Sequence, residues 1–258
     1  KIPLILLNAR ITKKTFRRWM ALGYFARSVF NKITIAYPQN LETAKYLKIL
    51  KVNKISHLGN LKFAENFQEN LEKMNINLKK ELTKKKIWVA SSTHRREEMF
   101  CAKAHIQLRK KIKNLITIII PRHIHRSEEI ISEIKNLRLK VSKHSTKPRS
   151  LKDTDIYIVD TFGETKKFHK IGSSVFLGGS IIDRGGQNPL EAARFGAKIL
   201  HGPNTDNFKD VYKLLKSLNV SKKILTPKKL ASSITFKKNK IIGNKIKDIG
   251  QNILKKTI

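Results

Sequence analysis

The sequence contains a single cysteine among its 258 residues, so it cannot form a disulfide framework. It has no run of about 18 apolar residues, the length that a membrane-spanning helix needs, and no secretory signal pattern at its start. These absences argue against a disulfide-stapled secreted domain and a membrane-spanning domain, and they favour a reducing, cytoplasmic setting. The chain opens on Lys1, directly before what reads as a buried strand, so we expect it to be part of a longer protein.

Acidic residues are also scarce. Asp and Glu number 19 against 55 Lys and Arg, which gives a formal net charge of +36. Such a charge attracts polyanions, either nucleic acid or an anionic lipid surface. Lys, Ile and Asn are abundant along the whole chain, however, and a compositional bias of the genome explains the charge equally well. Interleaved aromatics, zinc-ligand spacing and a helix-turn-helix pattern are missing, which argues against a nucleic-acid partner.

Hydrophobic residues make up 40% of the chain, enough for one large core or two smaller ones. Short apolar runs alternate with helical patterns, which is typical of βα units that build a parallel sheet. We therefore predict an α/β fold. A polar stretch rich in Lys, Glu and Asn predicts a domain boundary, which divides the chain into a first domain (1–68), a linker (69–86) and a second domain (87–258).

The periodicity predicts the order of elements in both domains. In the first domain the predicted strands are 2–7, 33–37 and 55–58, and the predicted helices are 13–30 and 42–50. In the second domain the predicted strands are 87–92, 115–121, 139–143, 155–160, 174–179 and 197–202, and the predicted helices are 95–113, 127–137, 165–171, 189–195 and 207–218. This alternation is that of a doubly wound sheet, in which ligands bind outside the carboxyl ends of the strands.

Polar residues follow the first two strands of the second domain. The segment SSTHRREE follows the first strand, where His94 could reach an anion, although a Ser/Thr cap with Glu in the first helical turn explains it as well. The segment PRHIHR follows the second strand, where Arg122 could grip a phosphate through two parallel hydrogen bonds. The alternatives are a solvated basic loop and a metal held by His123 and His125, for which no further ligand lies nearby in the sequence.

Two later segments are also candidates. In DTFGE, Phe162 offers an aromatic face and Gly163 permits a left-handed backbone, although an ordinary turn explains both. In GGSIIDRGGQNPLEAARFG, the glycine pairs 178–179 and 185–186 precede a helix that begins with an N-x-x-E capping box, from Asn188 to Glu191. Capping does not explain the glycines. A glycine loop at a helix N-terminus predicts a phosphate site, and its spacing fits neither a dehydrogenase nor an ATPase loop.

Five motifs taken together carry a resemblance to a known family. These are STH followed by EE, PRHxxR, DTxGE, FLGGSxxxRGGxNPLEAA and GPNTxNF, in order between about Trp88 and Phe208, with PLILLNAR and FRRW before them. The chain resembles the Kdo (3-deoxy-D-manno-octulosonic acid) transferases of lipid A biosynthesis. It departs from the usual pattern at Arg95 and Arg96, and at Gln187, where a His is frequent.

The resemblance implies a GT-B fold, with two Rossmann-like domains facing a cleft, of which the N-terminal acceptor domain is incomplete here. It implies transfer of Kdo from CMP-Kdo to a lipid A precursor with inversion, with no metal or cofactor. Arg122 and His123 would hold the CMP phosphate, and Glu191 the ribose. The implied CMP-binding residues are Pro121, Arg122, His123, Phe162, Gly163, Glu164, Ser180, Gly186, Asn188, Pro189, Leu190 and Glu191.

The family's catalytic base is a Glu in the N-terminal domain, and the sequence offers no counterpart. The only acid in residues 1–60 is Glu42, which lies within a predicted helix. We therefore expect the base upstream of Lys1 and a chain that binds donor without catalysing transfer. The family works at the cytoplasmic face of the inner membrane of Gram-negative bacteria, whose anionic surface would attract the basic chain. The alternatives are a GT-B glycosyltransferase or epimerase that uses a UDP-sugar, and a non-catalytic basic module that binds RNA or anionic membrane.

Overall fold

The computed structural model describes residues 2–56, 59–60, 63 and 74–257, and it divides into two compact units. The first unit comprises Lys1–Phe67 and Ile246–Ile258, and the second comprises Gln68–Lys245. This division differs from the expected one at the C-terminal segment, since the chain from Ile246 onward groups with the first unit. Residues 69–73 of the expected linker lie outside the described residues, and the later part of that linker forms a helix within the second unit.

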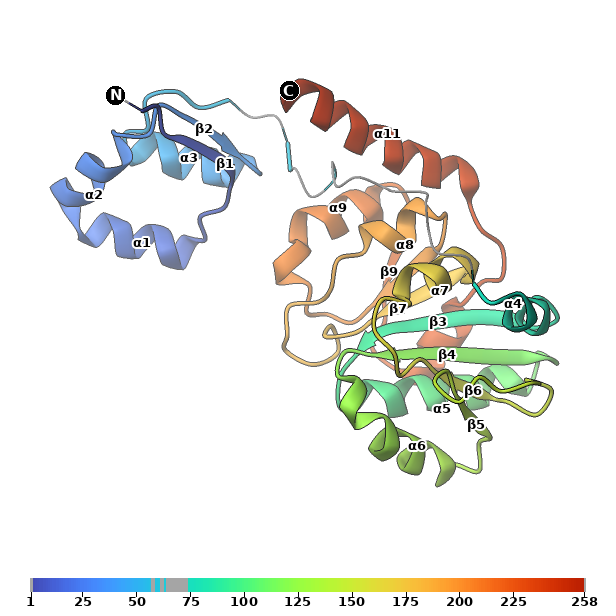
Figure 1. The fold of residues 1–258 in the computed structure, drawn as a ribbon. Coiled ribbons are helices and arrows are strands. Elements are labelled where there is room, and N and C mark those ends of the chain that lie inside the picture. Colours follow the sequence, from blue (N-terminus) through green and yellow to red (C-terminus); the bar gives the residue numbers. More distant parts are fainter. Residues whose placement is uncertain (1, 57–58, 61–62, 64–73, 258) are drawn as a thin grey trace. The chain divides into compact units, whose positions relative to one another are not determined.

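The first unit is a small α/β unit. Its two strands, β1 (Ile5–Ala9) and β2 (Ile35–Pro38), pair in parallel, and its helices are α1 (Lys13–Ala21), α2 (Gly23–Phe30) and α3 (Leu41–Ile49) (Figure 1). The predicted single helix 13–30 is wrong, because the chain breaks at Leu22 and Gly23 adopts a φ of +49°. The predicted strand 55–58 is reduced to one bridge between Ala36 and Ile55, and its residues 57–58 lie outside the described part.

A compact apolar cluster holds this unit together. The Trp19 ring packs edge-on against Phe30, with ring centroids 5.0 Å apart. The buried members of the cluster are Ala9, Ile11, Ala26, Phe30, Ile33, Ala36, Leu47, Leu50 and Val52. They come from both strands, from the helices and from the connections between them, as expected where a short parallel sheet is covered by helices.

The second unit contains a seven-stranded, fully parallel sheet in the order β5-β6-β4-β3-β7-β8-β9 (Figure 1). The strands are β3 (Lys86–Thr93), β4 (Leu115–Pro121), β5 (Val141–Lys143), β6 (Ile156–Ile158), β7 (Ser174–Leu177), β8 (Lys198–His201) and β9 (Ser221–Lys223). The helices are α4 (Ile76–Thr83), α5 (Glu97–Arg109), α6 (Ser127–Lys135), α7 (Thr165–Ile171), α8 (Leu190–Arg194), α9 (Lys209–Ser217), α10 (Pro227–Ser233) and α11 (Lys240–Thr257), the last of which continues into the first unit. The predicted α/β class is confirmed.

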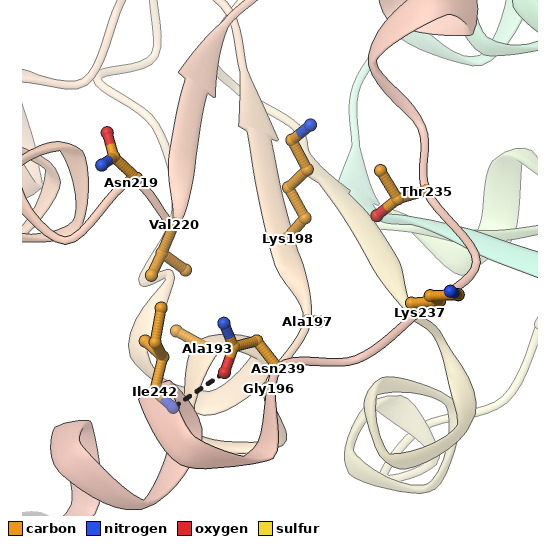
Figure 2. Close-up of a pocket in the computed structure, with 10 residues that line it drawn as sticks. All are labelled: Ala193, Gly196, Ala197, Lys198, Asn219, Val220, Thr235, Lys237, Asn239 and Ile242. Carbon is orange, nitrogen blue, oxygen red and sulfur yellow. Dashed lines mark hydrogen bonds between the residues drawn. The ribbon is translucent and has the colours of Figure 1, made fainter.

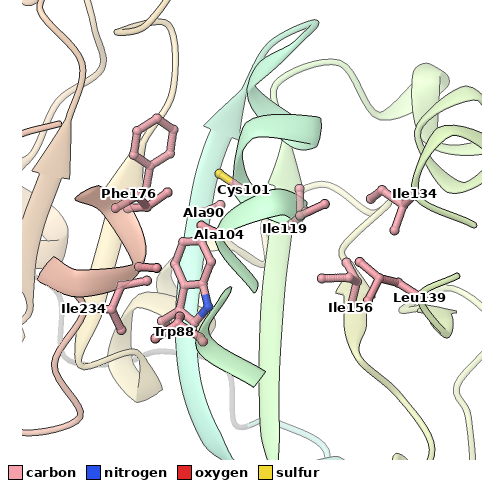
Figure 3. Close-up of a cluster of buried hydrophobic side chains, with 14 of the residues drawn as sticks. Trp88, Ala90, Cys101, Ala104, Ile119, Ile134, Leu139, Ile156, Phe176 and Ile234 are labelled. Carbon is pink, nitrogen blue, oxygen red and sulfur yellow. The ribbon is translucent and has the colours of Figure 1, made fainter. Parts of the chain in front are cut away.

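Helices cover both faces of this sheet. Trp88 and Ala90 of β3 face a buried cluster with Cys101 and Ala104 of α5 (Figure 3). On the other face, a Cβ placed on Gly172 at the end of α7 would lie 2.7 Å from the Val89 side chain. Every residue of β4 is buried, which explains why LITIIIP reads as a continuous apolar run rather than an alternating one.

No described helix is both long and apolar enough to cross a bilayer. Among the described residues, β9, α10 and α11 are elements that the sequence pattern did not predict, and α4 lies within the expected linker. The helix α10 begins with Thr226, whose hydroxyl accepts a hydrogen bond from the Lys229 N–H, and has Pro227 in its first turn. These are ordinary helix-start signals.

The close packing of the glycine loop predicts a large cost for one methyl group. A Cβ on Gly178 would lie 2.2 Å from the Ser92 carbonyl oxygen, which is backbone and cannot yield. We expect Gly178→Ala to lower the free energy of unfolding by about 3 kcal/mol. Gly163→Ala is the control, since nothing lies within 4 Å of its Cβ and only its φ of +80° is strained, at about 1 kcal/mol. Equal losses in urea unfolding would contradict the packing argument.

Candidate functional site

The predicted site residues all follow strands of one parallel sheet, so they share its carboxyl edge. The chain leaves β3 for β4 on one side, and it enters β7 on the other side of β3 after passing through β6 and α7. The connections therefore reverse direction between β3 and β7. Such a reversal opens a crevice at the carboxyl ends, where ligands bind in doubly wound folds.

A buried carboxylate occupies this point. Glu97, in the first turn of α5, is fully buried and accepts four backbone hydrogen bonds. Its Oε2 accepts from the N–H groups of His94 (3.0 Å) and Gly179 (2.7 Å). Its Oε1 accepts from those of Ser180 (3.0 Å) and Ile181 (2.9 Å). The side chain therefore ties the end of β3 to the loop after β7.

This arrangement gives the amides after the first glycine pair a role that was not predicted. The sequence assigned anion binding to the loop of Gly185 and Gly186, whereas the amides of Gly179 and Ser180 donate to Glu97 of the same chain. Gly178 has no Cβ because the Ser92 carbonyl takes that space, and Gly179 adopts a φ of +65°. The sequence placed Glu97 only as a favourable charge in the first helical turn.

The second glycine pair is held by a later segment of the chain. Gly185 and Gly186 both have a positive φ, at +74° and +73°, and the Gly186 N–H donates to the Gly179 carbonyl. Asn207 clamps the loop, since its backbone N–H donates to the Gly185 carbonyl and its side-chain amide to the Arg184 carbonyl. Asn204 acts in the same way, since its backbone N–H donates to the Ser180 carbonyl and its side-chain amide to the Ile181 carbonyl. The GPNTxNF motif thus acts as a brace for the glycine loop.

Two of the predicted CMP-binding residues lie inside this loop. Ser180 is fully buried, and its hydroxyl donates to the Leu177 carbonyl while accepting from the Gly202 N–H at 2.8 Å. Gly186 is buried, and a Cβ there would lie 3.0 Å from the Asn204 carbonyl. Instead of lining a pocket with its hydroxyl, Ser180 supports the loop from within.

Four cationic or titratable side chains lie close to the glycine loop. A Cβ on Gly179 would lie 3.4 Å from the His94 Nε2 and 3.4 Å from the Arg184 Cβ, so Gly179 lies between these two residues. The His94 ring lies edge-on to His123, with centroids 5.4 Å apart. Burial lowers the pKa of His94, and the charges of His123, Arg184 and Arg122 lower it further against the opposing effect of Glu97. We call these four residues, His94, Arg122, His123 and Arg184, the cationic cluster.

The cluster has unused binding capacity. The His94 Nε2 is buried and has no hydrogen-bond partner among the residues that the structure describes. Arg122 and Arg184 are exposed, and among the described residues neither guanidinium forms an ion pair. Arg122 is held at this place because its N–H donates to the Thr93 carbonyl at 2.9 Å. A planar guanidinium with free N–H groups is suited to a phosphate or a carboxylate.

The other arginine of PRHIHR has a structural role. Arg126 is 3.1 Å from the buried Glu98 and 3.3 Å from Glu129, and its side chain is only 12% exposed. Burial raises the pKa of Glu98, while the Arg126 charge acts against the rise. Arg126 therefore neutralises a buried acid and is not available to a ligand.

The helix after the glycine loop begins one residue later than predicted. Pro189 is the N-cap of α8, and the Asn188 Oδ1 accepts a hydrogen bond from the Leu190 N–H at 3.1 Å. Leu190 is buried. The second half of the predicted capping box is absent, because Glu191 bonds to His169 of α7 instead, with 2.7 Å between Oε1 and Nδ1.

The DTFGE segment lies at the carboxyl end of β6. Asp160 anchors it, since its carboxylate accepts from the N–H (2.9 Å) and the hydroxyl (2.6 Å) of Ser145. Phe162 is 81% exposed, and Gly163 has open space around it. Glu164 lies 3.1 Å from the Lys167 ammonium. An exposed aromatic ring beside free space could stack on a base, as the resemblance implies.

The surroundings contain no metal-binding cluster of three or more His, Cys, Asp or Glu side chains within the described ranges. A cavity of about 200 Å³ lies elsewhere, near the amino ends of β8 and β9, where Lys198, Asn219 and Asn239 are among its lining residues (Figure 2). None of the predicted CMP-binding residues lines it.

Comparison with known proteins indicates the same family as the motifs do. Residues 1–65 match the family described as "3-Deoxy-D-manno-octulosonic-acid transferase (kdotransferase)". A 3-deoxy-D-manno-octulosonic acid transferase of Rickettsia prowazekii (strain Madrid E) is 31% identical over 253 residues, which cover 98% of this chain and 54% of the relative. The chain is homologous to the Kdo transferases. This confirms the resemblance read from the motifs.

Other Kdo transferase homologues align over similar lengths. The enzyme of Haemophilus influenzae (strain ATCC 51907 / DSM 11121 / KW20 / Rd) is 28% identical over 83% of this chain and 51% of its own length. A probable mitochondrial Kdo transferase of Arabidopsis thaliana is 30% identical over 84% of this chain and 51% of its own length. The chain thus spans about half the length of the curated relatives that it matches.

Solved structures show the same fold. The C-terminal CMP-Kdo binding domain of WaaA from Acinetobacter baumannii superposes with a TM-score of 0.55 at 22% identity, over 66% of this chain and 89% of that domain. The apo structure of OtsA superposes with a TM-score of 0.53 at 10% identity, over 96% of this chain and 63% of its own. These similarities confirm the predicted GT-B class for the Kdo transferase homologue.

The role of Glu97 gives a stability prediction. In Glu97→Gln, an NH₂ group replaces one carboxylate oxygen. This group is a donor, so it cannot accept the hydrogen bonds that the backbone N–H groups make to that oxygen. We expect the free energy of unfolding to fall by about 2 to 3 kcal/mol, the range for lost hydrogen bonds to a charged group. Glu128→Gln is the control, since that side chain is 76% exposed and its variant should unfold as the parent does. A chemical denaturation series measures both, and a Glu97→Gln chain as stable as the control would contradict the assigned role.

Proposed function

We propose that the second unit binds CMP-Kdo and that the whole protein transfers Kdo from this donor to a lipid A precursor, with inversion. The observation that carries the proposal is the cationic cluster, which lies at the reversal point of the sheet and whose two guanidinium groups form no ion pair with any described residue. An anion held there lies next to the loop that leads to Glu191. The homology to the Kdo transferases supports CMP-Kdo over other anions.

The chemistry that we propose for the cluster is stabilisation of the leaving group. Breaking the bond between sugar and phosphate leaves negative charge on CMP, and the guanidinium of Arg122, with His123 beside it, would stabilise that charge as it develops. We propose that no metal takes part. The backbone of Arg122 is held by its bond to the Thr93 carbonyl, so the residue is already at this edge of the sheet before a ligand binds.

The nucleoside is proposed to lie between the DTFGE segment and α8. Phe162, Gly163 and Glu164 would meet the cytidine, and the chain from Asn188 to Glu191 would hold the phosphate and ribose. Glu191 supports the ribose role, because its side chain is 27% exposed while one of its oxygens is fixed by His169. A carboxylate oriented in this way is suited to accept hydrogen bonds from a ribose diol.

We propose that this chain alone binds donor without completing transfer. Inverting transfer to a sugar hydroxyl requires a general base, and the acid in residues 1–60, Glu42, already accepts a hydrogen bond from Tyr46 at 2.8 Å on α3. The base would be a Glu upstream of Lys1, as the family resemblance implies.

Nucleotide binding by titration calorimetry tests the donor proposal. We expect the chain to bind CMP, and Arg122→Ala to weaken the affinity by about 10- to 100-fold through loss of a charge-assisted phosphate contact. Arg149→Ala is the matched control, because Arg149 is exposed and lies outside the cluster, and it should change affinity by no more than about twofold. Absence of CMP binding at millimolar concentration would refute the proposal.

The same titration with UDP separates the nearest alternative. A chain that prefers UDP to CMP would be a GT-B enzyme for a UDP-sugar. RNA binding that is salt-dependent and survives the combined Arg122→Ala and Glu191→Ala changes would favour the non-catalytic basic module. The homology supports the CMP donor instead.

We also propose that the protein works at the anionic cytoplasmic face of the inner membrane of a Gram-negative bacterium, where its lipid acceptor lies. The first unit offers a surface that supports this. Large apolar side chains are exposed where α1 meets α2, including Leu22 (52%), Tyr24 (87%) and Phe25 (60%), beside the exposed Arg17 and Arg18. Aromatic and apolar groups flanked by cations are suited to an anionic lipid interface.

Vesicle sedimentation tests this surface. We expect the double variant Tyr24→Ser with Phe25→Ser to lower the affinity for vesicles of phosphatidylglycerol and phosphatidylethanolamine by at least about tenfold, since two exposed aromatic groups that would insert into the lipid interface are lost. Leu41→Ser on α3 is the control, because Leu41 is 67% exposed but lies on another helix of the same unit. Equal binding by the double variant and the control would remove the support for this surface.

A further inference from the structure

The carboxylate proposed to meet the ribose has an unexpected partner. Glu191 lies on α8, and its Oε1 is 2.7 Å from the Nδ1 of His169 on α7. The imidazole is almost completely buried, with 4% of its side chain exposed, whereas the carboxylate is 27% exposed. The pair therefore consists of a fixed inner group and an outer group that a ligand can reach.

The hydrogen-bonding pattern of His169 indicates which ring nitrogen donates. Within the part of the chain that the structure describes, its buried Nε2 has no hydrogen-bond partner. A proton on Nε2 would leave a buried donor unsatisfied, while an unprotonated nitrogen there leaves only a weak acceptor unmatched. A proton on Nδ1 satisfies Glu191, so we assign the Nδ1–H as the donor to the carboxylate.

The backbone of His169 is also fixed. The Lys238 ammonium lies 3.5 Å from the His169 carbonyl and also donates to that of Lys170, at the last turn of α7. Burial lowers the pKa of Lys238 to about 8. Among the described residues, His169 is the only group that bonds to the Glu191 side chain. The orientation of the carboxylate thus depends on one ring, which is itself locked by the packing of α7.

We infer that His169 is a positioning residue that holds Glu191 in the orientation needed to accept hydrogen bonds from the ribose hydroxyls of the donor nucleotide. The inference rests on the proposed function for its ligand. It goes beyond that function, because it assigns the discrimination between ribose and deoxyribose to a buried histidine that does not itself contact the nucleotide. With Oε1 occupied by His169, Oε2 remains to meet the diol.

The experiment compares CMP with 2′-deoxy-CMP in calorimetric titrations of the whole chain. We expect the parent to favour CMP, and both Glu191→Ala and His169→Phe to lose about tenfold or more of that preference, since a bond to a charged group is removed or misplaced. The double variant should lose no more than either single variant. His169→Asn, which can present an amide N–H at the same place, should restore part of the preference.

The possible failures are distinguishable. A His169→Phe chain that keeps the full preference while Glu191→Ala loses it would overturn the inference and leave the proposed function intact. A parent that binds CMP no better than 2′-deoxy-CMP would overturn the ribose role of the pair, and a parent that binds neither would overturn the proposed function as well. Independently of any nucleotide, nitrogen NMR of His169 should show the proton on Nδ1, and a proton on Nε2 would overturn the inference.

Discussion

The rest of the site depends on the hydrogen bonds that the Glu97 carboxylate accepts from the backbone. A buried carboxylate is costly unless its oxygens are satisfied, and here four backbone N–H groups from two strand ends satisfy it. The same negative charge lies beside His94, where it opposes the effect that the nearby His123, Arg184 and Arg122 have on the pKa of that ring. The loop that Glu97 holds also brings Gly179 between His94 and Arg184.

This interaction also changes how the glycine loop should be understood. Loops of this composition often bind phosphate through their own amides, but the amides directly after β7 are already bound to Glu97, so an anion at the site must use the cationic cluster and the start of α8 instead. The loop's task is to place Arg184 next to His94, and Asn204 and Asn207 brace it from the opposite side. Gly178 and Gly185 are small because a carbonyl and an amide side chain take the space of their Cβ atoms.

The sequence was sufficient to predict the elements whose signal is local. The buried strand β4 and the helix α7 begin and end at the predicted residues, because an unbroken apolar run and a helix between two turns are both visible in sequence. The role of Glu97 was not predictable, since its loop partners lie 82 to 84 residues away. At Glu191 the local sequence pattern predicted a capping box, but the side chain forms a tertiary hydrogen bond with His169 instead. The strand β9 is short and consists of one Ser and two Lys, so it offered no apolar run to detect.

The abundance of positive charge makes an unpaired arginine weak evidence by itself. With 55 basic and 19 acidic residues, most cations must lack a partner. The placement of Arg122 and Arg184 is a stronger argument, because both lie at the reversal point of the sheet beside the buried, unpartnered His94 Nε2. By contrast, Arg126 in the same segment is matched to Glu98. Because acidic residues are scarce in this chain, the lack of an acid beside a given cation says little about that cation. The few buried acids are more informative, because they show which cations the fold itself needs and which it leaves for a ligand.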